Sequence, residues 1–371
     1  MAASEQSQPN RRDERVREIG FARRALRRPE LGAAAGCVLV IIFFAIFAGD
    51  SGLFSARGIV NFLEVSAQLG ILSVAVALLM IGGEFDLSLG SMIAFAGVII
   101  AILSTQYGWP VWASIVVAFV AAYVVGYLNG WLVMKTGLPS FIVTLASLFI
   151  LRGITLGATR LITGRTQIPG MKELADNDWL APLFNGQFGG SVLTWLADIG
   201  IMDKRPDGLP TVQGIPVSIL WWIALSAVAT WVLLQTRFGN WIFTVGGDPN
   251  AARNVGVPVA KVKIRLFVLT ALAAALFACI QVLTVGSADT SRGLQKEFES
   301  IIAVVIGGTL LTGGYGSAVG AMFGALIFGI VQMGIFYTGI DTDWFKAFMG
   351  IMLLAAVLFN DYIRNKASET R

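Results

Sequence analysis

The sequence contains no histidine and only two cysteines among its 371 residues. Histidine is the commonest metal ligand, the usual general base and the usual proton relay, so its absence removes the residue on which much of acid–base and metal catalysis depends. Cys37 and Cys279 lie far apart inside apolar runs, which provides neither the ligand spacing of a metal site nor a disulfide framework. The sequence therefore predicts two buried cysteines, no catalytic residue, no metal site and no cofactor bound by this chain.

Charged residues are also scarce, at 13% of the chain against roughly 25% in an average soluble domain. Hydrophobic residues make up 56% of the chain, and the mean hydropathy is +0.74. The formal net charge of +4 sits in a few polar segments rather than along a face that follows a nucleic-acid backbone, which excludes nucleic acid as a partner. A lipid bilayer is the solvent that fits this composition.

The apolar residues come in runs long enough to cross a hydrocarbon layer ~30 Å thick at about 1.5 Å per residue. These runs predict an all-α integral membrane protein, a polytopic bundle of about ten transmembrane helices with glycine-broken spans, within residues 33–361. The predicted spans are 33–49, 59–81, 87–105, 111–134, 139–161, 216–235, 266–287, 299–312, 316–338 and 344–361.

The distribution of lysine and arginine predicts how the bundle is oriented. An even number of spans places both ends on one side, and that side holds 17 of these residues against nine on the other. Eight of the 17 are arginines in the polar tail 1–32. Because basic residues are retained on the cytoplasmic side, both termini, including the tail 362–371, are predicted to be cytoplasmic. Two interpretations of tail 1–32 stay open, namely topology and solvation alone, or an amphipathic helix among lipid headgroups.

Two polar segments interrupt the spans. Residues 162–215 form a predicted external loop, either a passive insertion or a surface that meets an external partner. Residues 237–263 form a predicted cytoplasmic loop, in which Asp248 suits a helix N-cap, Pro249 the first helical position and Gly256 a left-handed C-terminal cap. A connector needs only a handful of residues, so this short capped helix indicates a docking surface, the alternative being a solvated connector.

Two carboxylates, Glu84 and Asp86, lie between apolar runs, where a charge near the bilayer centre costs about 2.5–3.5 kcal/mol. They must therefore face water or bind a partner. Asp86 is predicted to cap the helix that begins at Leu87, and the same broken backbone is predicted to line a cavity. A second glycine-rich break, residues 307–314, is either a site of close helix packing or a hinge.

Polar side chains elsewhere in the spans suit a route for a hydroxyl-rich solute that needs hydrogen bonds but no fixed charge. Each of them alone also suits a hydrogen bond between helices. The residues predicted to line a translocation path are Phe85, Asp86, Ser88, Asn129, Thr144, Gln281, Thr309 and Gln332.

Four stretches together resemble the permeases of ATP-binding-cassette (ABC) importers for ribose, xylose and other simple sugars. They are residues 83–91 (GEFDLSLGS), 137–145 (GLPSFIVTL), 246–256 and 302–317. The resemblance runs from about residue 55 to the C-terminal end and leaves out much of 170–215. The first stretch commonly reads GGIDLSVG in that family, whereas here Glu84 stands at the second glycine and Phe85 replaces isoleucine.

The resemblance implies that the short helix of residues 248–256 is the coupling element that docks on an ATPase subunit. The residues to which it assigns this role are Asp248, Pro249, Asn250, Ala251, Ala252, Arg253 and Gly256. The chain has no G-x-x-x-x-G-K-[ST] phosphate loop, so ATP is expected to be used by a separate ABC ATPase subunit. The resemblance also implies a periplasmic or extracellular solute-binding protein, a second copy of the chain, and the lipid of the bacterial cytoplasmic (inner) membrane.

The implied cargo is a simple sugar, a pentose or a hexose, and the chain is not expected to be an enzyme. Three alternatives stay open: a nucleoside or another polar small molecule as cargo of the same kind of permease, an ion-coupled secondary transporter, and a membrane scaffold that transports nothing. Ion coupling normally uses carboxylates in several spans, which are scarce here, and a scaffold has no need of a capped cytoplasmic helix.

Overall fold

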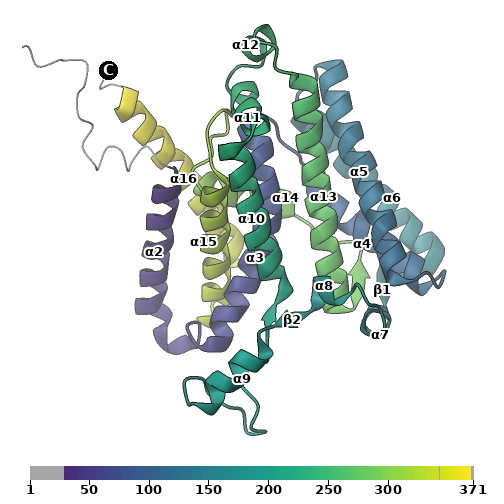
Figure 1. Ribbon diagram of the computed structural model, residues 1–371, viewed down its shortest axis with the longest axis vertical. Helices are drawn as coiled ribbons and strands as arrows, with labels where there is room; N and C mark the ends of the chain where they lie inside the picture. The colour runs from purple at the N-terminus through teal and green to yellow at the C-terminus, as the bar shows by residue number, and fades with distance from the viewer. Residues whose placement is uncertain (1–28, 342, 369–371) are drawn as a thin grey trace, which may run out of the picture.

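Helices packed side by side, mostly along one direction, form the body of the protein (Figure 1). The computed structural model describes residues 29–341 and 343–368, with side chains up to residue 358. Within these residues the strands form two short antiparallel pairs, β1 (Gln167–Pro169) with β4 (Ser287–Asp289) and β2 (Gln187–Phe188) with β3 (Ile215–Pro216). This architecture confirms the predicted all-α fold class.

Seven helices of the described chain are long and apolar enough to cross a membrane. They are α2 (Pro29–Ala48), α3 (Ala56–Ile81), α5 (Val111–Thr136), α6 (Ser140–Thr163), α10 (Val217–Gln235), α13 (Val259–Val285) and α15 (Ala318–Tyr337). Two others are α4 (Leu89–Thr105), which is apolar but shorter, and α16 (Trp344–Ser368), which is apolar over its first part. The short helix η1 (Gly49–Ser51) turns the chain between α2 and α3.

Helix α14 (Lys296–Ile306) differs from the span predicted for residues 299–312. Its 11 residues cover only about 16 Å at 1.5 Å per residue, roughly half of a hydrocarbon layer. The glycine-rich stretch 307–317 that follows is not helical, because its backbone makes turns that include left-handed glycines at Gly308 and Gly313. A total of ten spans is therefore still a prediction.

Local sequence explains where several of the long helices begin and end. Pro110 and Pro139 immediately precede α5 and α6, where the missing N–H of proline removes no helical hydrogen bond. Gly137 and Gly164 end the same two helices with φ of +70° and +69°, a left-handed conformation that glycine adopts without strain.

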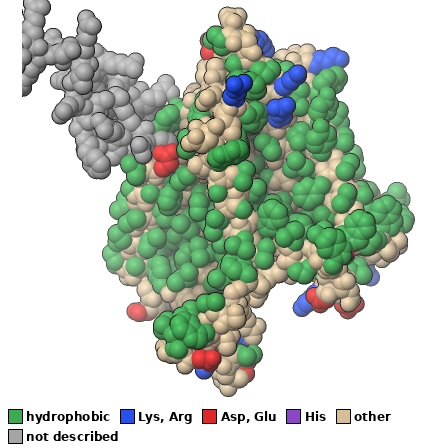
Figure 2. All heavy atoms as spheres, viewed as in Figure 1, with side chains coloured by type: hydrophobic (Ala, Val, Ile, Leu, Met, Phe, Trp, Pro, Cys, Tyr) green, Lys and Arg blue, Asp and Glu red, His purple; other side chains and the backbone are tan. Residues whose placement is uncertain are grey.

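Apolar side chains cover the flanks of the bundle, and charged side chains lie mainly toward its two ends (Figure 2). Lysine and arginine side chains gather near α11 (Arg237–Gly247) and α12 (Pro249–Asn254), at the upper end in Figures 1 and 2. This distribution is that of a bundle whose flanks contact lipid.

The opposite end carries a non-spanning excursion of residues 164–216. It contains α7 (Met171–Asp176), α8 (Pro182–Asn185) and α9 (Gly190–Asp198), and α9 projects away from the bundle (Figure 1). The tail predicted for residues 1–32 lies outside the described residues as far as residue 28, and α16 extends to Ser368, into the predicted tail 362–371.

Helices α3 and α13 form the centre of the bundle, because most of their residues are buried whereas α2, α5, α6 and α10 expose more of theirs. Helix α13 packs on α3, α4 and α5, and α15 packs on the other side of α3. Cys37 and Cys279 are both buried and unpaired, as predicted.

Candidate functional site

Residues 248–256 form the short capped helix that their sequence predicts. Asp248 Oδ1 accepts hydrogen bonds from the Asn250 and Ala251 backbone N–H groups, at 2.8 and 3.1 Å. Pro249 occupies the first turn of α12, and Gly256 follows the helix with a φ of +82°. The local prediction is thus confirmed, because each end of α12 has the cap that its residue type provides.

Helix α12 presents most of its surface outward from the end of the bundle (Figure 1). Ala252 is fully buried and packs with the apolar cluster beneath it, whereas Asn250, Ala251 and Arg253 are exposed. Val255, at the end of the helix, is 74% exposed although it is apolar. The exposed face of α12 thus carries an apolar and a cationic side chain, Val255 and Arg253.

Two non-helical stretches interrupt the spans: residues 82–88 between α3 and α4 (the first break) and residues 307–317 between α14 and α15 (the second break). The backbone of α11 contacts both breaks at one place. A Cβ built on Gly246 would lie 1.7 Å from the Ile81 carbonyl oxygen, and one on Gly313 would lie 2.8 Å from the Gly83 Cα. The Gly314 N–H donates a 2.8 Å hydrogen bond to the same Ile81 oxygen. We call this contact, formed by Gly83, Gly246, Gly313 and Gly314 around Ile81, the glycine junction. It has no room for a side chain at Gly246.

Next to the glycine junction, a buried ion pair joins stretch 237–263 to the first break. Lys263, in the second turn of α13, donates to Glu84, and both residues are buried. The sequence predicted that Glu84 needs a partner, and Lys263 is that partner. Stretch 237–263 is therefore attached to the first break by a backbone contact and by a charge pair.

Asp86, Ser88 and Asn129, all predicted to line a path, lie together in a buried hydrogen-bonded cluster. Asp86 Oδ1 accepts from the Ser88 N–H at 2.9 Å and from its hydroxyl at 2.6 Å, while Asp86 Oδ2 accepts from the Thr270 hydroxyl at 2.8 Å. The Asn129 amide donates to the Ser88 hydroxyl at 3.0 Å. The prediction that Asp86 caps a helix starting at Leu87 is wrong, because α4 starts two residues later and Asp86 binds side chains of its neighbours.

Side chains of α6 bind the backbone of the same break. The Phe85 N–H donates to the Ser140 hydroxyl at 3.1 Å, and the Leu87 N–H donates to Thr144 at 3.0 Å. Irregular backbone inside a membrane protein needs such partners, since lipid offers none. This break is thus held by α5, α6 and α13 together, and Thr270 and Ser140 are two members that sequence reasoning missed.

Thr309 lies apart from that cluster, in the second break. It is 1% exposed, and a Cβ built on Gly316 would lie 2.6 Å from its hydroxyl oxygen. Gln281 and Gln332 are elsewhere again, and both line a cavity of about 150 Å³ between α3, α13 and α15. The structure therefore divides the predicted path residues into two groups and a separate Thr309.

Comparison with known proteins identifies the class of the chain. Residues 58–357 match the family described as "Branched-chain amino acid transport system / permease component". The chain belongs to this family of transport permeases.

Individual relatives confirm the predicted resemblance to sugar permeases. The chain is 30% identical to the xylose transport system permease protein XylH of Escherichia coli (strain K12), over 89% of this chain and 91% of the relative. It is 31% identical to the fructose import permease protein FrcC of Rhizobium meliloti (89% and 85%) and 32% identical to the ribose import permease protein RbsC of Escherichia coli (strain K12) (87% and 91%). No solved structure matches the chain.

Proposed function

We propose that this chain is the membrane-spanning subunit of an ABC importer that moves a simple sugar, a pentose or a hexose, into the cell. The three relatives named above are sugar permeases, which supports this class of cargo. In this proposal ATP is hydrolysed by a separate ABC ATPase subunit, and this chain itself binds no cofactor. The observation that carries the proposal is the direct contact of the α11–α12 stretch with both broken spans at the glycine junction.

The mechanism follows from that contact. Closure of the ATPase subunits displaces α12, which is joined to Gly246 of α11 through Gly247 and Asp248. Because Gly246 touches the backbone at Ile81 and Gly314 without an intervening side chain, the displacement reaches residues 82–88 and 307–317 together. Movement of the two breaks then changes which side of the membrane has access to the path.

The proposed assembly has three further parts. The excursion 164–216, at the end opposite α12, is the docking region of a periplasmic or extracellular solute-binding protein. A second copy of the chain shares one path with the first. In this arrangement both termini and α12 face the cytoplasm, and the bundle lies in the bacterial cytoplasmic membrane.

Transport by purified components tests the function. The chain, its ATPase subunit and a solute-binding protein are reconstituted in vesicles and supplied with labelled xylose, ribose or fructose. ATP-dependent uptake that persists when ionophores abolish proton and sodium gradients is the expected result. Uptake that follows an ion gradient and needs no ATPase would assign the chain to secondary transport, and uptake of nucleosides but of no monosaccharide would reject the sugar.

Arg253 tests the docking role of α12. Its side chain is exposed and donates a 3.3 Å hydrogen bond to the Asn250 side-chain oxygen on the same helix, so a change of charge there should leave the bundle folded. Arg253→Glu is expected to lower co-purification of the ATPase subunit by about tenfold or more, because a repulsive charge replaces an attractive one at the interface. Arg165→Glu, at the opposite end of the bundle, is the matched control. If Arg253→Glu leaves docking of the ATPase subunit unchanged, α12 is not part of the interface.

A further inference from the structure

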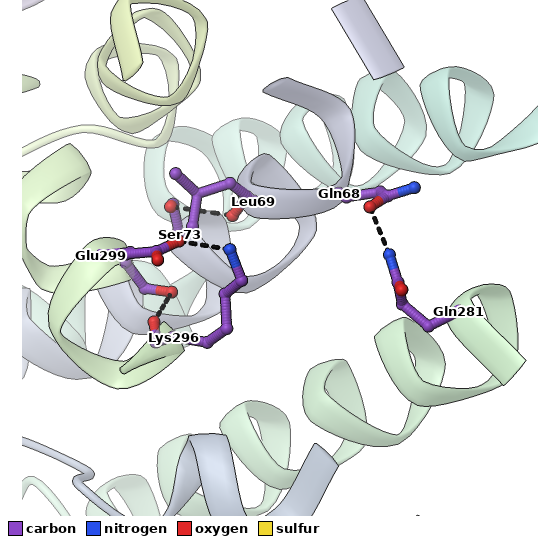
Figure 3. Close-up of polar contacts among 7 residues, drawn as sticks. Gln68, Leu69, Ser73, Gln281, Lys296 and Glu299 are labelled. Atoms are coloured by element: carbon purple, nitrogen blue, oxygen red, sulfur yellow. Dashed lines mark hydrogen bonds and ion pairs between the residues drawn. The ribbon is translucent and has the colours of Figure 1, made fainter. Parts of the chain in front are cut away.

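A chain of polar side chains crosses the centre of the bundle from α3 to the loop that precedes α14. Arg292 donates to the Gln281 side-chain oxygen at 3.5 Å, Gln281 donates to the Gln68 side-chain oxygen at 2.5 Å, and Gln68 donates to Glu64 at 3.3 Å. Figure 3 shows Gln68 and Gln281 pointing toward each other from α3 and α13. A guanidinium at one end and a carboxylate at the other fix the direction of both amides, because each amide must accept on the arginine side and donate on the glutamate side.

This polar chain borders the cavity of about 150 Å³. Gln68, Gln281 and Arg292 form one part of its wall, and Gln332 of α15 forms another. The Gln332 side-chain oxygen is buried without a hydrogen-bond partner, which is costly unless a bound molecule supplies a donor. The remaining wall is partly apolar and includes Leu69 and Phe277.

The cavity lies at membrane depth and is bordered by irregular backbone. Gln68 is near the middle of the 26-residue helix α3. The loop from Thr290 to Gln295 reaches the first turn of α4, since a Cβ built on Gly293 would lie 2.3 Å from the Gly90 carbonyl oxygen. Gln295 has a φ of +66°, the one left-handed residue other than glycine in the described chain. Non-helical backbone at this depth is stable only where protein covers it or it lines a water-filled space.

The charges around the cavity favour a neutral ligand. Lys296, which also lines it, is paired with Glu299 (Figure 3), so its ammonium is already neutralised. The guanidinium of Arg292 has the carboxylate of Asp289 as its opposite charge, and it is connected through the two amides to a second carboxylate, Glu64. A ligand with a full charge would leave one end of this balanced arrangement uncompensated.

We propose that this cavity is a cargo-binding subsite for the ring of a neutral monosaccharide, an inference that rests on the proposed function. Amides and a guanidinium offer the paired donors and acceptors that neighbouring hydroxyls need, and the Leu69 and Phe277 side chains face the C–H groups of the ring. An engineered cavity of about 150 Å³ holds one benzene ring, so a cavity of this size has room for one ring and not for a nucleoside, which carries a base in addition to its sugar. The size therefore selects a single ring.

Protection of a cysteine from chemical labelling tests this subsite without the ATPase or the solute-binding protein. In a background carrying Cys37→Ala and Cys279→Ala, Gln332→Cys is expected to react with a small water-soluble thiol reagent, and saturating xylose, ribose or fructose should slow the reaction about tenfold, as expected for a mostly occupied site. Gln106→Cys, exposed at the end of α4, is the control and should react at the same rate with and without sugar. Absence of protection by all three sugars would overturn the subsite.

Transport by side-chain variants separates a cargo contact from a merely structural one. Gln281→Leu should lower the rate of sugar uptake about tenfold, the effect of one hydrogen bond, while Gln281→Asn retains an amide and should recover part of it. Both variants should keep wild-type ATPase docking. If Gln281→Leu transports normally, the subsite is rejected although the proposed function stands. If instead the unaltered chain shows no ATP-dependent uptake, the proposed function fails. The labelling experiment then tests alone whether the cavity binds a sugar.

Discussion

Glu84 and Lys263 hold two opposite charges where neither meets bulk water. Their side chains are 11% and 10% exposed, and they belong to segments that are far apart in the sequence. Removing one member of a buried pair leaves an uncompensated charge, whereas removing both members leaves no charge to compensate. The two residues therefore matter more to stability singly than together.

Single and double variants of the pair should show this asymmetry. Glu84→Gln and Lys263→Met are each expected to lower the free energy of unfolding by about 3–5 kcal/mol, and the double variant should recover most of that loss. Thermal unfolding of the purified chain in detergent measures the differences. Asp198→Asn, which breaks an exposed pair with Lys204, is the control and should change stability by less than about 1 kcal/mol. Additive losses in the double variant would contradict a coupled pair.

At the residue scale, the sequence predicted which residues require a partner but not which residues those partners are. A carboxylate among apolar residues must be paired or hydrated, so Glu84 and Asp86 were recognisable. Their partners, Lys263 and Thr270, lie 179 and 184 positions away, and only the packing of α13 against the first break brings them close. The polar chain through Gln68 was missed for the same reason, since each glutamine alone suits a bond between any two helices.

At the scale of elements, two adjacent glycines at the end of α11 differ sharply in their surroundings. Gly246 is enclosed by the backbone of both breaks, whereas a Cβ on Gly247 would meet nothing within 4 Å. Both residues are glycines in α11 and neither has a left-handed φ, so alanine is compatible with the backbone conformation at each position. This pair isolates the contribution of the glycine junction.

Alanine substitution at the two positions should have opposite effects. Gly246→Ala forces α11 away from Ile81 and is expected to lower the melting temperature and uncouple ATP hydrolysis from uptake, because overpacking costs about 1–3 kcal/mol. Gly247→Ala should retain transport and raise stability by up to about 1 kcal/mol, since alanine favours a helix. Unfolding curves and vesicle uptake measure both effects. Normal coupling in Gly246→Ala would show that the junction transmits nothing.

The sequence predicted most elements for a physical reason that is local. Apolar runs indicate spans, and the caps at Asp248 and Gly256 define α12, because each depends on neighbouring residues only. The structure of residues 299–312 differs from the single helical span predicted for them, because apolar composition does not distinguish a full span from α14 followed by glycine turns. The glycine junction could not be predicted in this way, because it joins three segments that are far apart in the sequence.

At the scale of the whole molecule, the two ends of the bundle carry different structures. One end presents α12 and a group of cations, and the other presents the excursion that contains α9 (Figures 1 and 2). Since basic residues are retained in the cytoplasm, we propose that the first end faces that side. This assignment fixes the direction in which the proposed machine works.

Labelling from either side of the membrane should confirm the orientation. In the cysteine-free background, Arg165→Cys is expected to react with an impermeant maleimide in intact spheroplasts, and Arg253→Cys only in inverted vesicles, because the two residues lie at opposite ends. Detergent-solubilised samples, in which both react, give the control for reactivity. Labelling of both positions from one side would contradict the proposed topology.

The glycine junction has a mechanical consequence for the proposed transporter. Side chains between two moving parts absorb displacement by changing rotamer, so that the second part lags behind the first. Backbone atoms in direct contact have no such freedom. Their packing resists movement of the two parts toward each other, and the hydrogen bond from the Gly314 N–H to the Ile81 oxygen also resists their separation. The glycine junction can thus transmit movement of α12 in both directions. In the proposed transporter, α12 alone is then sufficient to drive both the opening and the closing of the path.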